Sequence, residues 1–174
     1  MQYISSDTNI WLDFYTIQKI ELPFRLPYTY IMSCDALNDE ILSPSGLGSL
    51  LISFGLVSVN LTIDEFSLAE EYGKNYTRLS IYDRIALAIA KERNITLLTG
   101  DGALRKAAKQ ENVPIMGTLG ILDQLWDSKR ISTSELKECL QQLIANNGGA
   151  VRLPREELQS RLKFLVDYEI GYKE

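Results

Sequence analysis

The segment from Ser80 to Gln110 constrains the fold of this chain more than any other stretch. Its sequence, SIYDRIALAIAKERNITLLTGDGALRKAAKQ, predicts a helix, a short buried strand, a tight turn and a second helix. A helix–strand–helix run of this kind is typical of an α/β fold with a parallel sheet. Functional side chains of such sheets gather at the carboxyl ends of the strands. Asp101 is expected at such an end, and Asp83 at the start of the preceding helix.

The same alternation extends along most of the chain. Strands are expected over residues 3–6, 28–33, 57–61, 95–99 and 113–116. Helices are expected over 9–20, 35–42, 47–54, 62–76, 81–94, 103–111 and 117–126. We therefore predict a three-layer α/β/α fold with a central parallel sheet of four to five strands.

The character of the sequence changes after Asp127. Ser132 and Glu135 have capping-box spacing ahead of a leucine-rich helix, and Pro154 opens a second helix. These features predict a C-terminal helical hairpin. We accordingly expect a first domain over residues 1–128 and a helical extension over residues 129–174.

Composition narrows the chemistry. The chain of 174 residues has a net charge of −5 and no histidine, which excludes histidine-based nucleophile pairs and zinc sites with histidine ligands. Cys34 and Cys139 lack metal-ligand spacing and are expected to be reduced thiols. No apolar run is long enough to span a bilayer, and the N-terminus shows no secretory signal, so we expect a cytoplasmic protein.

Four carboxylates are candidates for a site, and three of them directly follow a strand or open a helix: Asp7, Glu40, Asp83 and Asp101. Phosphodiester hydrolysis without histidine commonly uses hard divalent cations held by carboxylates. Acids from separate strand ends, meeting at one edge of a parallel sheet, would supply such a site. Several basic residues flank the proposed site in the sequence. They could guide a phosphate backbone or form a solvated face: Lys91, Arg93, Arg105, Lys106 and Lys109.

Each of these acids also has a purely structural interpretation. Asp7 and Asp101 can cap the helices that follow them, and Asp83 has capping-box spacing from Ser80. Glu40 can be a solvated helix residue beside Asp39. Their joint placement favours a shared site, although spacing alone does not establish that they converge.

The residues over Tyr3 to Leu125 resemble a PIN domain. The resemblance is carried by ISSDTNIWLDF at the N-terminus, by MSCDALNDEIL, and most strongly by residues 80–125, whose GTLGILDQL segment is similar to VapC-type toxins. It implies a divalent-metal-dependent endoribonuclease that cleaves single-stranded RNA, and a toxin of a toxin–antitoxin pair.

The resemblance also implies roles for individual residues. Asp7, Glu40, Asp83 and Asp101 would be catalytic and would hold Mg²⁺ or Mn²⁺, with Asp39 as the alternative to Glu40. Two polar residues, Asn9 and Thr99, would support the acids. The implied partners are an RNA substrate, an antitoxin protein and a second copy of the chain in a homodimer.

Two other functions stay open from the residues. The acidic composition allows a non-catalytic PIN-like module that binds RNA or protein. An unrelated phosphohydrolase acting on small phosphoesters is the third interpretation. It is disfavoured because Asp7-Thr8-Asn9 lacks the second aspartate of the haloacid-dehalogenase type.

Overall fold

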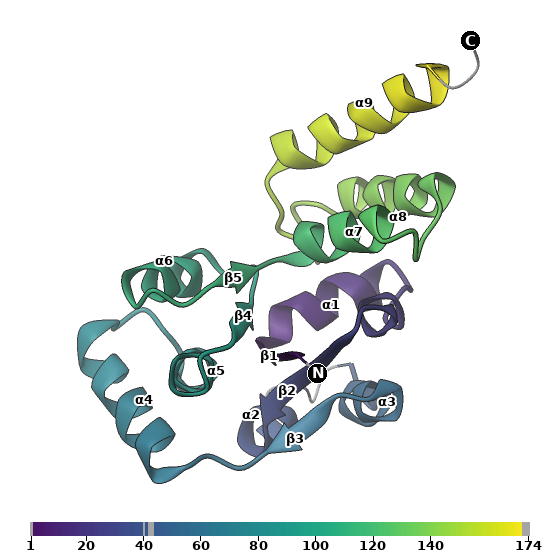
Figure 1. The fold of residues 1–174 in the computed structure, drawn as a ribbon. Helices are drawn as coiled ribbons and strands as arrows, with labels where there is room; N and C mark the ends of the chain where they lie inside the picture. Colours follow the sequence, from purple (N-terminus) through teal and green to yellow (C-terminus); the bar gives the residue numbers. More distant parts are fainter. Residues whose placement is uncertain (1, 40, 42–43, 172–174) are drawn as a thin grey trace. The chain divides into compact units, whose positions relative to one another are not determined.

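A five-stranded parallel sheet forms the centre of the computed structural model, which describes residues 2–39, 41 and 44–171. The strands lie in the order β3-β2-β1-β4-β5 (Figure 1). Their bounds are β1 (Gln2–Ser6), β2 (Tyr28–Ser33), β3 (Val57–Val59), β4 (Thr96–Leu98) and β5 (Ile115–Met116). The predicted α/β fold with a central parallel sheet is confirmed.

The helices also follow the predicted order. Their bounds are α1 (Thr8–Thr16), α2 (Cys34–Asp39), α3 (Leu47–Phe54), α4 (Ile63–Asn75), α5 (Ile81–Glu92), α6 (Gly102–Gln110), α7 (Thr118–Asp127), α8 (Thr133–Ala145) and α9 (Arg155–Gly171). The prediction that the first helix reaches Ile20 is wrong, because Gln18 has a left-handed backbone with φ of 57°. A 3₁₀ turn, η1 (Leu22–Arg25), follows where a loop was expected.

Two compact units make up the chain. The first comprises Met1–Trp11 and Pro27–Gly117 and contains the whole sheet, and the second comprises Leu12–Leu26 and Thr118–Glu174. The predicted division into a catalytic domain over residues 1–128 and a helical extension over residues 129–174 stays a prediction. Across the described residues, no helix has the length and apolar character needed to cross a membrane.

Alternation along β2 assigns the two faces of the sheet to different helices. Ile31 belongs to the buried cluster that includes Leu97 of β4 and the apolar side of α5. Its neighbour Tyr30 faces the opposite way and contacts Trp11 of α1 edge to face, with ring centroids 5.2 Å apart. Because successive strand residues point to opposite faces, the sheet is covered by helices on both sides.

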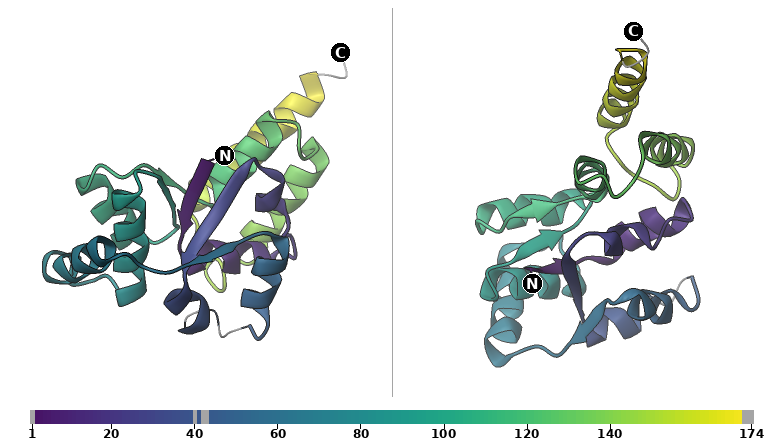
Figure 2. Two further views of the ribbon diagram at one scale, coloured as in Figure 1. Left: turned by 60° about the horizontal axis from the view of Figure 1, so that its bottom comes forward. Right: turned by 45° about the vertical axis from the view of Figure 1, so that its right-hand side comes forward.

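Helix α5 is buried along its middle part. Every residue from Ile85 to Ala90 is buried, because the helix contacts β1, β2 and β4 and also packs against α4 and α6. These three helices gather on one face of the sheet (Figure 2). The alanines allow the close approach, and the Ser5 hydroxyl donates to the Ala86 carbonyl at 2.9 Å.

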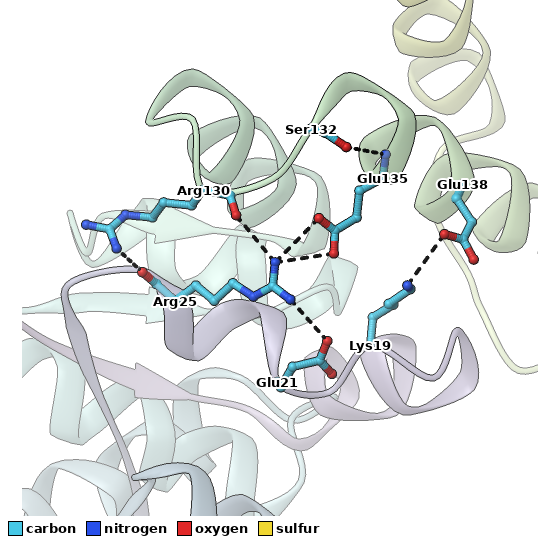
Figure 3. A network of polar contacts seen from close by, with 7 residues as sticks. All are labelled: Lys19, Glu21, Arg25, Arg130, Ser132, Glu135 and Glu138. Atoms are coloured by element: carbon cyan, nitrogen blue, oxygen red, sulfur yellow. Dashed lines mark hydrogen bonds and ion pairs between the residues drawn. The ribbon is translucent and has the colours of Figure 1, made fainter.

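Polar contacts organise the second unit around Arg25 of η1. Its guanidinium reaches the Glu135 carboxylate at 3.3 Å and the Arg130 carbonyl at 3.4 Å, while Arg130 donates in return to the Arg25 carbonyl (Figure 3). Lys19 pairs with Glu138 at 3.5 Å. Exposed pairs of this kind contribute about 1 kcal/mol or less each. Their joint effect is to tie η1 to the start of α8.

Helix α9 packs on α8 and is joined to α7 by an ion pair and by aromatic rings. Arg161 donates to the Asp123 carboxylate at 2.7 and 2.9 Å. Trp126 of α7 meets both Phe164 and Tyr168 edge to face. The hairpin of α8 and α9 predicted from the leucine pattern is thus present, and α7 is part of the same packing unit.

A buried acid in the second unit predicts an unusual pH dependence of stability. Burial raises the pKa of Asp13 from 3.8 to about 6, although a hydrogen bond from Thr118, 2.6 Å long, lowers it. The folded state therefore holds this proton more tightly than the unfolded chain. The contribution of Asp13 to the free energy of unfolding consequently falls as the pH rises from about 4 to about 6, and stays low above that range.

Replacing Asp13 with asparagine should remove this fall. The variant should be more stable than the wild type at pH 7 by about 1–3 kcal/mol, since one pKa unit corresponds to about 1.4 kcal/mol. Urea unfolding at pH 4.5 and pH 7 measures both effects. Asp167→Asn, an exposed acid on α9, is the matched control. Equal pH dependence in Asp13→Asn and the wild type would contradict the expectation.

Candidate active site

The strand order points to one position on the sheet edge. From β1 the chain adds β2 and β3 on one side, and then returns to place β4 on the other side of β1. In open parallel sheets, ligands bind where the order reverses, at the carboxyl ends of the two strands concerned. Asp7 directly follows β1, and the Thr99–Asp101 turn directly follows β4. Both predicted acids therefore flank the reversal point.

Asp7 is the buried acid of this site. Asp7 is only 4% exposed to solvent. One carboxylate oxygen accepts the Thr8 backbone N–H at 2.7 Å, and the other accepts the Thr99 hydroxyl at 2.9 Å and the Asn9 side-chain amide at 3.3 Å. Asn9 and Thr99, the two residues predicted to support the acids, thus both contact Asp7.

Thr99 connects Asp7 to the loop that carries Asp101. Its hydroxyl donates to Asp7 and accepts the Asp101 backbone N–H at 3.1 Å. Asp101 in turn caps α6, since its Oδ1 accepts the Leu104 N–H at 2.8 Å. Within the described part of the chain, the second oxygen of Asp101 has no hydrogen-bond donor. Helix capping therefore occupies one oxygen and leaves the other available.

Asp83 begins α5 with the capping box that its spacing predicts. Its Oδ2 accepts the Ser80 N–H at 2.7 Å, while Ser80 Oγ accepts the Asp83 N–H at 3.1 Å. Because α5 leads back into β4, its N-terminus lies at the edge of the sheet where the strands end. Asp83 is half-buried there. In the described residues, no hydrogen bond joins it to Asp7 or Asp101.

Tyr82 joins the start of α5 to the end of α2. Its hydroxyl donates to Asp39 at 2.9 Å. Tyr82 also shares with Asp7 the lining of a small pocket of about 10 Å³. Asp39 is thus held beside the site by a residue adjacent to Asp83. Glu40, the predicted fourth acid, lies outside the described residues.

Arg105 supports the loop after β4, a role that was not predicted from the sequence. Its guanidinium donates to the Thr99 carbonyl at 3.1 Å. A Cβ added at Gly117 would lie 3.0 Å from the same guanidinium, so a residue without a side chain suits this position. The signal in the sequence was the spacing of four between Asp101 and Arg105, which places an arginine over the first turn of α6.

The atoms that could bind a metal at this edge are carboxylate, hydroxyl and amide oxygens. Such ligands suit a hard divalent cation such as Mg²⁺ or Mn²⁺. Thr99 links Asp7 to the loop that carries Asp101, whereas Asp83 bonds to Ser80 at the start of α5. Among the residues that the structure describes, no three acids stand close enough together to hold an ion. The chemistry of these oxygen ligands therefore fits a hard divalent cation.

A family model described as PIN domain matches residues 3–166 of the chain. The match thus includes both the sheet and most of the C-terminal helices. The comparison with curated proteins finds no significant match. The comparison with solved structures finds none either.

Proposed function

Since the chain belongs to the PIN-domain family, whose members are generally nucleases, we propose that it is a divalent-metal-dependent ribonuclease acting on single-stranded RNA. Family membership itself indicates a nuclease-type function. The substrate, the metal and the endonucleolytic mode are our proposal. It rests on one observation: Asp7 lies at the reversal of the strand order and shares Thr99 with the loop of Asp101.

In this proposal the side chains of the site divide the work of binding and orientation. Asp7 and Asp101 bind Mg²⁺ or Mn²⁺, a cation that supplies an activated water and neutralises the phosphate. Thr99 and Asn9 hold the Asp7 carboxylate in one orientation. Asp83 and Glu40, or Asp39 in place of Glu40, complete the acidic set. Mutual repulsion among these carboxylates is relieved when the cation binds.

We further propose that the protein is the toxin of a toxin–antitoxin pair, that an antitoxin protein blocks this site, and that the chain forms a homodimer. The support is the likeness of the GTLGILDQL segment to VapC-type toxins. Growth arrest after induced expression in a bacterial host, dependent on Asp7, is the outcome that this role requires. Undisturbed growth of cells that express the catalytically active protein would contradict the proposed role as a toxin.

A non-catalytic RNA- or protein-binding module is the second candidate function. The observation that favours it is that Asp83 and Asp101 both act as helix caps. A capping role by itself explains why each acid is present. Metal binding separates the two candidates, because a module without a catalytic centre has no reason to bind a cation at Asp7.

Addition of Mn²⁺ should raise the melting temperature of metal-stripped protein. A ligand that binds only the folded state at a hundred times its Kd stabilises it by about 2.7 kcal/mol, which is several degrees for a domain of this size. Differential scanning fluorimetry measures the shift, and Asp101→Asn should reduce it. An unchanged melting temperature at millimolar Mn²⁺ would favour the non-catalytic module.

A further inference from the structure

A groove lies between α6 and the loop that joins α4 to α5. Its volume is about 420 Å³, which is within the range of about 300–1,000 Å³ typical of ligand sites. One wall runs from Asn75, the last residue of α4, through the loop to Leu79, and the other is a side of α6. The α6 residues in the lining are Ala103, Lys106, Ala107 and Gln110.

The groove begins beside the candidate active site. Leu79 directly precedes Ser80, which caps α5 together with Asp83. Ala103 lies in the first turn of α6, two residues after its cap Asp101. At about 1.5 Å per helical residue, Lys106 lies roughly 7 Å further along α6 than Asp101. A chain bound in the groove would therefore reach the acids without leaving the surface of the first unit.

The charge of the groove is opposite to that of the protein as a whole. Arg78 and Lys106 line it, and none of the acids that the structure describes does, although the chain has 23 acidic and 18 basic residues. Both side chains are exposed. Within the part of the chain that the structure describes, neither forms an ion pair with an acid. Their charges are consequently available to a ligand.

The neighbouring side chains are fixed by contacts behind the groove. Tyr76 lies in the wall, and its hydroxyl donates to Glu111 at 2.5 Å. Lys91 donates to the Glu111 carbonyl at 2.6 Å, which anchors that segment to α5. The amides of Asn75 and Gln110 add hydrogen-bonding groups at the rim. The groove is thus a preformed surface with two positively charged side chains, two side-chain amides and one aromatic ring.

We propose that this groove binds the phosphate backbone of single-stranded RNA and leads it to the acids of the active site. The inference rests on the proposed function. It supplies what an acidic nuclease needs, since phosphate affinity comes mainly from lysine and arginine. Arg78 and Lys106 contact phosphates, while Asn75, Gln110 and the Tyr76 ring face the bases, an arrangement that tolerates many sequences.

Binding should be measured without cleavage, in full-length Asp7→Asn protein with a fluorescent single-stranded RNA and anisotropy as the readout. Adding Arg78→Ala and Lys106→Ala should weaken binding at least tenfold. It should also reduce the slope of log K against log salt by about 1.4, because each lost phosphate contact on a single strand contributes about 0.7. Lys109→Ala removes the same charge from an exposed position of α6 outside the groove and should change affinity less than twofold.

The single variants Lys106→Ala and Lys109→Ala should also be compared. Equal losses of RNA affinity in these two variants would overturn the proposal, because net charge alone would then govern binding. Undiminished RNA binding in the double variant would also overturn it. So would retention of RNA binding together with loss of binding to a protein partner, since the groove would then be a protein-docking surface. In each of these cases metal-dependent cleavage by the wild-type chain would leave the proposed function intact, so the two failures are distinguishable.

Discussion

Asp7→Asn should reduce cleavage of single-stranded RNA by about a thousandfold or more. Removing a single electrostatic group at a catalytic centre commonly costs 10²–10³ in rate, and Asp7 is proposed to act as a metal ligand as well. Asparagine has the same size and keeps an oxygen that can accept the Thr8 N–H. The variant should therefore fold normally, and the loss should appear in the rate of cleavage rather than in the yield of folded protein.

The control for this prediction is Asp64→Asn, which removes the same charge from an exposed position in the first turn of α4. Cleavage by this variant should equal that of the wild type. Growth arrest on induced expression should follow the same pattern, with arrest by Asp64→Asn and none by Asp7→Asn. Comparable cleavage rates for Asp7→Asn and the wild type would contradict the assignment of Asp7 to the active site.

Arg93→Met should lower the free energy of unfolding by about 3 kcal/mol. Arg93 donates to both oxygens of Glu65, at 2.6 and 3.2 Å, and the Glu65 side chain is only 1% exposed. Glu65 also completes the capping box of α4 by accepting the Thr62 N–H at 2.8 Å. Removing one partner of a buried pair is costly, at about 3–5 kcal/mol, because the remaining charge is left without compensation. The lower end applies here because Arg93 is partly exposed.

The same variant should reverse the pH dependence contributed by Glu65. Burial alone would raise the pKa of Glu65, but hydrogen bonds from Arg93 and Thr62 and the charge of Arg93 hold it below 4.5. In the wild type this contribution to stability is therefore present above pH 4.5 and is lost as the pH falls. Without Arg93, burial becomes the main influence and the pKa rises. The contribution then increases as the pH falls.

Urea unfolding at pH 4 and pH 7 measures both the loss and the reversal. Glu65→Gln combined with Arg93→Met should recover part of the stability, because no buried charge is then left unpaired. Arg152→Met, an exposed arginine in the second unit, is the matched control and should change stability by less than about 0.5 kcal/mol. A loss in Arg93→Met no larger than in this control would contradict the importance of the buried pair.

The sequence predicted the elements well where local signals are strong. The bounds of α3 and β2 agree with the predicted ones, and the capping box predicted at the start of α5 is present. The end of α1 was not predicted correctly. The backbone is left-handed at Gln18, and no glycine, the usual sequence signal for that conformation, is present there. The second unit was also not foreseen, since the packing of Leu12–Leu26 with Thr118–Glu174 depends on contacts between distant segments.

The candidate site was predicted only in part, for a related reason. The positions of Asp7 and Asp101 after β1 and β4 follow from strand boundaries, which the sequence indicates. The link through Thr99 joins residues far apart in the chain, and only the resemblance pointed to it. The contact of Tyr82 with Asp39 joins residues 43 positions apart in the chain, which no local pattern predicts. Glu40 stays a prediction.

Cleavage of a labelled single-stranded RNA by metal-stripped protein, with and without added Mn²⁺, tests the central claim most directly. The rate should rise from background on addition of Mn²⁺, return to background with a chelator, and stay at background in Asp7→Asn purified in parallel. Cleavage that persists in the chelator, or that is equally fast in Asp7→Asn, would contradict a metal-dependent ribonuclease centred on Asp7.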